Sequence, residues 1–551
     1  MLCPKQHQDS CAFYSKLHEK FELPCQPSRC EWEVSGLSSR TCPHSKQEWR
    51  LKCKVYPDVN AAIGNTPLIK LNKIPQAAGL KCNVYAKCEF LNPGGSAKDR
   101  VAKRMIEDAE RAGLLKPGMT VIESSSGNAG IALALQAAIK GYKAIIIISE
   151  FSAISPEKLA VLNALGAELV RTPKSEPIDS ESGFIGIATK LHKEIPDSII
   201  LDQFTNPSSP LAHYDTTAEE ILDALDGKVH MAVIGAGTGG TLTGLGRKLK
   251  EINPNTKIVG VDPIGSTLAL PEALNVTEDN HFEVDGIGFC FISTVMDRNI
   301  VDEWVKTGDR ESMLMSRRII REEGLMVGNS SGAALTAALK QGKKLRENEN
   351  LVVVFADGVR NYLTRGFVSD QWMELRGYST PVNRNKLWWW EHPVKELKWQ
   401  ELRLLHEKAT CQQTLQAMNH NDIIHIGITN NLVHLIGIVS KRELTNSILS
   451  QHRQPEDEIT LAMNPVYAKC NPEAGLGLVS RLLEAEDYVV ITKETSNNRS
   501  RLTDKPLGIV YNCDLLEYVY KDWNESTTKV VPVNLHKEIL VNRLATSIRI
   551  Q

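Results

Sequence analysis

Short apolar runs alternate with helical stretches between residues 56 and 375. The runs have the length of buried strands, and they cover residues 66–71, 82–89, 120–124, 144–149, 167–172, 198–203, 231–237, 257–263 and 351–357. Residues 128–141 and 155–166 are examples of the helical stretches between them. This alternation predicts an α/β fold in which parallel or mixed sheets are covered by helices on both faces. Ligands of such sheets bind where the strands end and the next helices begin.

The pattern changes outside this region and divides the chain into five segments. Residues 435–444 and 506–515 share a leucine, Gly-Ile-Val and an acidic residue, which predicts two β-α-β modules that pair with each other. A linker before them contains Trp388, Trp389 and Trp390, which we expect to make an inter-domain contact. The segments are a polar, loop-rich extension (1–55), the α/β domain (56–375), the linker (376–396), the repeat pair (397–520) and a tail (521–551).

The composition narrows the classes of partner and compartment. The net charge of −2 gives no support for nucleic acid or an anionic membrane surface as a partner. The chain contains no apolar run of membrane-spanning length, and it does not begin with a signal-peptide pattern, so we expect a cytoplasmic protein. Six of the 12 cysteines lie in the first 53 residues, and none forms a CxxC pair. Free thiols and metal or haem ligation are both consistent with this cluster.

Lys98 stands at the start of a predicted helix. The turn at residues 92–95 leads into a helical pattern for which Ser96 is the expected N-cap. A lysine in the first helical turn lies beside the positive end of the helix dipole, which disfavours its cation. A neutral amine can form a Schiff base with an aldehyde cofactor. A solvated surface lysine is the alternative.

Three glycine-rich turns follow predicted strands and open helices. Residues 124–130 offer hydroxyls and amides to a carboxylate, residues 235–241 offer a phosphate nest, and residues 328–332 form the third turn. The second turn also satisfies G-x-G-x-x-G, with Asp262 about twenty residues later. A dinucleotide site is therefore an alternative to a cofactor that carries one phosphate.

The motifs resemble a known family. GGSAKDR, SSGNAG, GTGGT and GNSSG are similar to motifs of the fold-type II pyridoxal-phosphate enzymes of cysteine and cystathionine synthesis, over residues 56–375. AKCEFLNPGGS, RMIEDAERAG, LAHYDTTAEEI, VDGIGF and the tryptophan triplet resemble the cystathionine β-synthases in particular.

This resemblance implies a role for each matched residue. Lys98 is expected to be the Schiff-base lysine and proton shuttle, and Ser330 to face the pyridine nitrogen of pyridoxal 5′-phosphate. A neutral hydroxyl at that nitrogen favours β-elimination over transamination. The cofactor phosphate is assigned to Gly237, Thr238, Gly239, Gly240 and Thr241, and the cofactor 3′-oxygen to Asn128. The substrate is assigned to Ser125, Ser126, Asn128, Phe204 and Gly288.

The implied reaction is that of a hydro-lyase-type β-replacement enzyme. L-serine and L-homocysteine would give L-cystathionine, and cysteine in place of serine would release hydrogen sulfide. Phe204 stands where a tyrosine is usual in the family, Asp285 replaces a glutamate and Ala129 a threonine. A cysteine synthase-like or hydrogen-sulfide-forming enzyme is therefore an alternative, and a weakly active adenosyl-ligand sensor is another. The resemblance also implies a homodimer or homotetramer.

Two further ligands are implied by the resemblance. Cys30 and His44 are expected to hold the iron of haem b, with Arg247 as the partner of the thiolate. S-adenosylmethionine is a candidate allosteric ligand of the repeat pair, where Ser or Thr with Asp three residues later commonly holds a ribose. Ser440 and Glu443 come near to this pattern, and Asp514 matches it, although Tyr511 replaces the threonine. A purely structural repeat pair is the alternative.

Overall fold

The computed structural model describes residues 55–520, except for residues 126, 150–154, 173–179, 181–182, 278–280, 365, 384, 421–422, 450–452, 466, 485 and 494–504. The chain divides into two units, Met1–Pro57 and Asp58–Gln551, and all the described helices and strands belong to the second. Predictions for Cys30, His44, Ser126 and the tail therefore lie outside the described residues.

A four-stranded, fully parallel sheet with the order β5-β4-β3-β6 forms the smaller layer of the α/β region. Val121 of β3 packs against α3 and α4, whereas its neighbour Ile122 packs against α6 on the other face. Side chains alternate between the two faces of a strand, so the unbroken apolar run buries both of them. The elements are β3 (Thr120–Ser124), β4 (Lys143–Ser149), β5 (Glu168–Thr172), β6 (Ser198–Ile200), α3 (Lys98–Arg111), α4 (Asn128–Lys140), α5 (Pro156–Ala164) and α6 (Phe184–Glu194).

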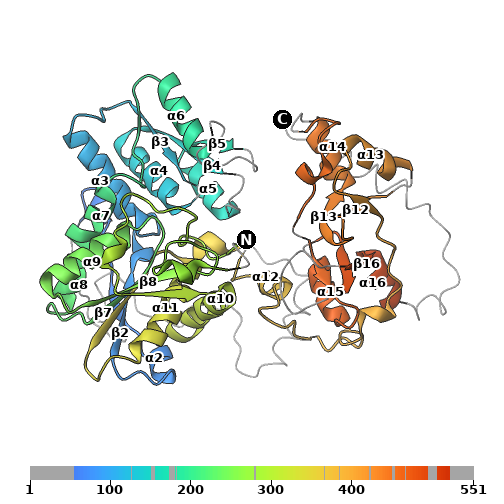
Figure 1. The fold of residues 1–551 in the computed structure, drawn as a ribbon. Coiled ribbons are helices and arrows are strands. Elements are labelled where there is room, and N and C mark those ends of the chain that lie inside the picture. Colours follow the sequence, from blue (N-terminus) through green and yellow to red (C-terminus); the bar gives the residue numbers. More distant parts are fainter. Residues whose placement is uncertain are drawn as a thin grey trace, which may run out of the picture. The chain divides into compact units, whose positions relative to one another are not determined.

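A six-stranded sheet with the order β1-β2-β10-β7-β8-β9 forms the larger layer, and only β1 is antiparallel to its neighbour. Val353 of β10 packs with α10 and α11, and Val352 with α8 and α9. Figure 1 shows these helices around the strands. The elements are β1 (Leu68–Lys70), β2 (Asn83–Cys88), β7 (Met231–Gly235), β8 (Lys257–Pro263), β9 (Glu303–Thr307), β10 (Asn350–Phe355), α2 (Ile74–Ala77), α7 (Ser208–Ala212), α8 (Ala218–Ala224), α9 (Gly240–Ile252), α10 (Asp309–Arg318), α11 (Asn329–Gly342) and α12 (Asp370–Leu375).

Two small modules follow, and each has a sheet in which the first pair of strands is parallel and the second antiparallel. This shared topology confirms the repeat. The first contains β11 (Leu404–His406), α13 (Cys411–His420), β12 (His425–Thr429), β13 (Leu435–Ser440) and α14 (Lys441–Leu449). The second contains β14 (Lys469–Cys470), α15 (Leu476–Leu483), β15 (Val489–Lys493), β16 (Lys505–Val510) and α16 (Asn512–Val519).

The tryptophan triplet does not act as one unit. Trp389 is buried in the core of the second module with residues of α15 and β15. Trp390 lies against Gly477 at the start of α15, so close that a Cβ on this glycine would overlap the indole ring. Trp388 is 60% exposed. Separately, none of the helices in the described ranges combines the length and the apolar character that a membrane crossing needs.

Candidate active site

The four predicted motifs lie at the N-termini of α3, α4, α9 and α11, on the side where the parallel strands end. Lys98 is the first residue of α3. Its N-cap is Ala97, so the expectation of Ser96 as N-cap is wrong, although the Ser96 hydroxyl accepts the Lys98 N–H at 3.2 Å. The Lys98 Nζ donates to Thr238 Oγ1 at 3.2 Å, which brings the amine to the predicted phosphate turn.

Two titratable groups set the charge around the amine. Burial lowers the pKa of Lys98 to about 8, and the nearby carboxylate of Glu123 opposes this shift. Burial also raises the pKa of Glu123 to about 7. The direction expected for Lys98 is therefore confirmed, but desolvation rather than the helix dipole is its main cause. Glu123 is 1% exposed, and it accepts the N–H groups of Asp202 at 3.0 Å and Gln203 at 3.3 Å.

The predicted phosphate turn leaves no room for side chains at its glycines. Gly239 has φ +93°, and a Cβ there would lie 2.5 Å from Met296 Cβ. A Cβ on Gly240 would lie 2.2 Å from Ser209 Oγ. Thr241 Oγ1 lies 3.1 Å from His213 Nε2, which holds the last hydroxyl of the turn. The N-terminus of α9 thus presents backbone amides with positive dipole character, as an anion site requires.

The segment around Gly288 joins this turn to the third motif. The Gly288 N–H donates to the Ala236 carbonyl at 2.8 Å, so it lies beside the phosphate turn. The Asp285 N–H donates to Asn329 Oδ1 at 3.2 Å, next to Ser330. Ser330 is buried in the first turn of α11.

The Asn128 motif is connected to the third glycine-rich turn through Asp357. Asn128 Nδ2 donates to Asp357 Oδ2 at 2.9 Å, and the Gly328 N–H donates to the Asp357 carbonyl at 2.8 Å. Ser125 Oγ accepts the Gly130 N–H at 3.0 Å, and its own O–H can still donate to a carboxylate. Lys98 therefore contacts the phosphate turn directly, and Asp357 and residues 285–288 connect the other motifs.

The dinucleotide alternative is not supported. The carboxylate of Asp262 is buried, and its Oδ2 accepts Lys306 Nζ at 2.8 Å and the N–H groups of Leu268 and Ala269 at 3.2 Å. An acidic residue that binds a ribose must present its oxygens to the ligand. Asp262 instead stabilises a turn beside β8.

Phe204, which was predicted to contact the substrate, lies in an aromatic cluster, and Asp285 lies in a charged pair. The rings of Phe204, Phe289 and Phe291 form a cluster with centroids 5.1–5.7 Å apart. The buried Lys158 pairs with Asp285, and its Nζ lies 4.9 Å from the centroid of the Tyr362 ring. Asp285, at the position where the resemblance predicts a glutamate, therefore forms one side of an ion pair beside the third motif.

The residues fit pyridoxal phosphate. A partly buried amine of lowered pKa suits an aldehyde, the α9 turn suits one phosphate, and the Ser330 hydroxyl suits a neutral pyridine nitrogen. The observation behind this fit is the α9 turn, where a Cβ on Gly239 or Gly240 would overlap its neighbours and the backbone amides stay open to an anion.

Comparison with known proteins agrees with this geometry. The family described as "Pyridoxal-phosphate dependent enzyme" matches residues 59–357. A cystathionine β-synthase from Apis mellifera is 47% identical over 507 residues, which are 91% of this chain and 98% of that protein. The chain belongs to the cystathionine β-synthase family. A family member from Mus musculus is 44% identical over 89% of this chain and 87% of its own.

A solved structure supports the same fold for the α/β region. The O-acetylserine dependent cystathionine β-synthase from Helicobacter pylori matches with a TM-score of 0.53 and 38% identity. The match covers 57% of this chain and 100% of that chain.

Other family-derived residues lie apart from the cofactor motifs. Arg247, the expected haem partner, is 56% exposed at its side chain and pairs with Asp297 at 2.9 Å. Ser440 ends β13, and Glu443 lies in the first turn of α14. The Asp514 carboxylate accepts the Tyr511 N–H at 2.7 Å and Gln400 Nε2 at 3.0 Å.

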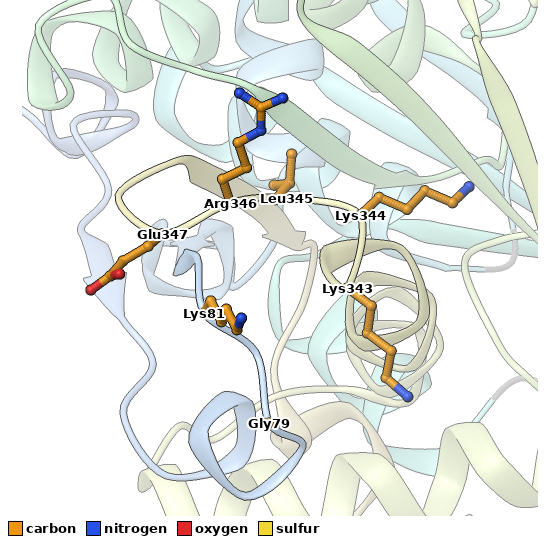
Figure 2. Close-up of a pocket in the computed structure, with 7 residues that line it drawn as sticks. All are labelled: Gly79, Lys81, Lys343, Lys344, Leu345, Arg346 and Glu347. Atoms are coloured by element: carbon orange, nitrogen blue, oxygen red, sulfur yellow. The ribbon is translucent and has the colours of Figure 1, made fainter.

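A separate hollow of about 460 Å³ lies at the other end of α11 from Ser330 (Figure 2). A helix of 14 residues spans about 20 Å, which separates this hollow from the cofactor motifs. Figure 2 shows Lys343, Lys344 and Arg346 pointing in different directions. Ligand pockets need convergent polar groups, and this hollow has none among the residues drawn.

Proposed function

We propose that this member of the cystathionine β-synthase family condenses L-serine with L-homocysteine to L-cystathionine, as a hydro-lyase-type β-replacement enzyme. Cysteine in place of serine would release hydrogen sulfide as a side reaction. The observation that carries the proposal is the hydrogen bond from Lys98 Nζ to Thr238 Oγ1, which joins the reactive amine to the phosphate turn. Family membership supplies the reaction class.

Each residue of the proposed site has a separate role in this reaction. Bound pyridoxal phosphate supplies an aldehyde for Lys98 and a ring that withdraws electrons from the substrate α-carbon. The Ser125 hydroxyl and the backbone N–H of Asn128, the first residue of α4, hold the amino-acid carboxylate. The Lys98 amine takes the proton from the α-carbon, and the hydroxyl leaves the serine β-carbon and departs as water with the thiol proton of homocysteine. After the homocysteine sulfur has bonded to the β-carbon, the amine returns its proton to the α-carbon. The buried Ser330 hydroxyl keeps the ring nitrogen unprotonated.

A second candidate function follows from Phe204. Its ring packs against Phe289 and Phe291, so this edge of the site offers no phenol hydroxyl where the family usually carries tyrosine. An apolar edge suits a substrate with an acyl leaving group, such as O-acetylserine, with sulfide or a thiol as the acceptor. This candidate differs from the first only in its substrates.

Product analysis separates the two functions. Purified full-length protein would be incubated with serine plus homocysteine, and in parallel with O-acetylserine plus sulfide or homocysteine. We expect cystathionine from the first mixture and none from a Lys98→Ala variant. Product from O-acetylserine alone would support the second candidate. Negligible turnover in both, with a melting temperature raised by an adenosyl nucleotide, would support the sensor alternative.

The haem expectation rests on the resemblance of the strings around Cys30 and His44. We propose that these residues ligate haem b and that Arg247 stabilises the thiolate. The matched variants Cys30→Ala, His44→Ala and Cys25→Ala test this, because Cys25 lies in the same cysteine-rich extension. We expect the first two to lose bound haem and the third to keep it. Equal haem content in all three would exclude the assignment.

The remaining proposals concern assembly and compartment. We propose a homodimer or homotetramer in the cytoplasm that has small-molecule substrates and neither nucleic acid nor a membrane as a partner. For the repeat pair, S-adenosylmethionine as an allosteric ligand and a purely structural role are the two alternatives. Light scattering of the purified protein tests the assembly, and a monomeric mass would exclude it.

A further inference from the structure

Asp357 lies at the point where three of the cofactor motifs meet. It follows β10 by two residues, and it forms a β-bridge with Ser96 in the turn before Lys98. Its carbonyl accepts the Gly328 N–H at 2.8 Å, at the start of the Ser330 turn. One residue earlier, the Ala356 carbonyl accepts the Ala97 N–H at 2.8 Å. The backbone here therefore fixes two motifs directly.

The side chain of Asp357 reaches the third motif. It is 2% exposed, and its Oδ2 accepts Asn128 Nδ2 at 2.9 Å and the Tyr362 O–H at 2.7 Å. Asn361 Nδ2 donates to Asn128 Oδ1 at 2.9 Å and lies 3.3 Å from Asp357 Oδ2. The amide of Asn128 is therefore held at both of its ends.

Asp357 and Asn361 differ in what they offer to the Asn128 amide. A carboxylate oxygen can only accept, and an amide nitrogen can only donate. With Asp357 at the nitrogen end and Asn361 at the oxygen end, a turned Asn128 amide would place oxygen against oxygen and nitrogen against nitrogen. The second N–H of Asn128 Nδ2 stays available for another acceptor.

We propose that Asp357 is a positioning residue which, together with Asn361, keeps an N–H of Asn128 directed at the 3′-oxygen of the cofactor. This inference rests on the proposed function, because it requires bound pyridoxal phosphate. An N–H donor stabilises the deprotonated 3′-oxygen, and a carbonyl in its place would repel it. Asp357 thus acts through Asn128 and does not touch the substrate.

A purely structural role for a buried aspartate is the competing explanation, and the chain offers a matched control. Asp262 is 0% exposed and also accepts several hydrogen bonds, but it contacts none of the four motifs through its side chain. Asp262→Asn should lower the melting temperature and leave the cofactor unchanged. Asp357→Leu removes the acceptor for Asn128, and Asn361→Ala removes the donor. Asp357→Asn keeps an acceptor oxygen at the same place.

The test measures the absorption of the bound cofactor, whose tautomers with a protonated and a deprotonated 3′-oxygen absorb at different wavelengths. Difference spectra of full-length variants against the wild type cancel any band that they share. We expect Asp357→Leu and Asn361→Ala to shift the cofactor toward the protonated tautomer and to release it about tenfold faster, as the loss of one buried hydrogen bond implies. Asp357→Asn, which keeps an acceptor oxygen, should have the wild-type spectrum.

Wild-type spectra and release rates in Asn361→Ala and in any folded Asp357→Leu protein would overturn the inference. If Asp357→Leu does not fold, Asn361→Ala alone decides, because it leaves the carboxylate in place. Failure of the proposed function has a different signature. In that case the wild type and the Asp262→Asn control would take up no pyridoxal phosphate at all.

Discussion

Lys98 derives its chemistry from two opposing effects on one amine. Burial favours the neutral form, and the carboxylate of Glu123 favours the cation. Burial has the larger effect, so the pKa falls from its ordinary value of 10.5 to about 8. Neutral amine is therefore present near physiological pH, which a nucleophile and proton acceptor requires.

Replacement of Lys98 should remove activity without removing the fold. Lys98→Ala removes both the covalent attachment of the cofactor and the base. General acid–base catalysis alone contributes about 10²- to 10⁴-fold to a reaction rate. We expect at least this loss in the rate of cystathionine formation, with a circular dichroism spectrum like that of the wild type. Activity within tenfold of the wild type would assign the chemistry to another residue.

The pH dependence of cofactor uptake should report the balance between Lys98 and Glu123. Only the neutral amine attacks the aldehyde, so uptake by the apoenzyme should rise through about pH 8 rather than near 10.5. Glu123→Gln removes the charge that raises the pKa of Lys98, so the midpoint should move to lower pH. Stopped-flow absorbance measures it. Glu107→Gln is the control, because Glu107 lies in α3, the helix that begins at Lys98. The midpoint of this variant should not change.

The sequence revealed the residues of the site that belong to contiguous motifs and missed those that depend on the fold. Lys98, Asn128 and Ser330 stand in glycine-rich turns whose chemistry can be recognised from local spacing. Asp357 and Glu123 follow or end apolar strands and carry no local signal. Asn128 lies 229 residues from Asp357, and Gln203 lies 80 residues from Glu123, so only the fold brings these partners together.

At the scale of elements, α3 is held in place by a buried charge network. Arg100 donates to Glu89 at 2.7 Å and to Glu220 at 2.6 Å, and Lys87 also donates to Glu220 at 2.5 Å. Burial alone would raise the pKa of Glu89, but the Arg100 guanidinium outweighs it and lowers that pKa. This network fixes the helix turn that presents Lys98.

Loss of Arg100 should therefore cost much stability. Arg100→Leu leaves Glu89, which is 0% exposed, as an unpaired buried charge, and breaking such pairs costs about 3–5 kcal/mol of unfolding free energy. Denaturant titration measures this cost. Arg104→Leu on the same helix breaks partly exposed pairs and should cost about 0–1 kcal/mol. Equal losses in the two variants would contradict the special role of the buried network.

A substitution in the phosphate turn before α9 should weaken cofactor binding. Gly239→Ala forces an alanine into φ +93° and places its Cβ 2.5 Å from Met296 Cβ, so the turn must shift. We expect the dissociation constant of pyridoxal phosphate to rise about tenfold or more, which corresponds to ~1.4 kcal/mol. Gly113→Ala has comparable φ strain (+71°) in open space, and it should leave cofactor binding unchanged. Equilibrium dialysis of the apoproteins compares the two.

Nine of the ten strands of the α/β region follow from apolar runs in the sequence, and β9 does not. This strand, Glu303–Thr307, carries the charged residues Glu303 and Lys306, and it lies at the edge of the six-stranded sheet. Edge strands tolerate polar side chains, and their pairing depends on a neighbour that local sequence does not specify. The antiparallel direction of β1 was likewise not evident from its short apolar run.

At the scale of the whole molecule, the two modules of the repeat pair join through their own aromatic side chains. The His425 ring lies 4.2 Å from the Tyr488 ring and 5.7 Å from the Tyr511 ring, centroid to centroid. Burial lowers the pKa of His425 to about 4, so the ring is neutral and keeps an acceptor nitrogen for the Tyr511 O–H. His425 Nδ1 and Tyr511 Oη are 3.1 Å apart.

This cluster bears on the candidate nucleotide site of the second module. A ribose at this position would share the oxygens of Asp514 with Gln400 Nε2 and the Tyr511 N–H, each of which donates to one of them. The bulk and the hydrogen bond of Tyr511 favour the structural alternative for the repeat pair. We therefore expect S-adenosylmethionine to leave the melting temperature of the wild type unchanged.

Tyr511→Thr restores the residue type that commonly holds a ribose and removes the ring. The variant should melt at a lower temperature, because an aromatic contact between the modules is lost, but it should gain a nucleotide-dependent rise. Binding at 100 times the dissociation constant stabilises a fold by about 2.7 kcal/mol, which calorimetry resolves. Tyr518→Thr, in the helix α16 that Tyr511 caps, removes a ring that packs on His392, and this variant should lose stability without this rise. A nucleotide-dependent shift already present in the wild type would show that the native rings do not close the site.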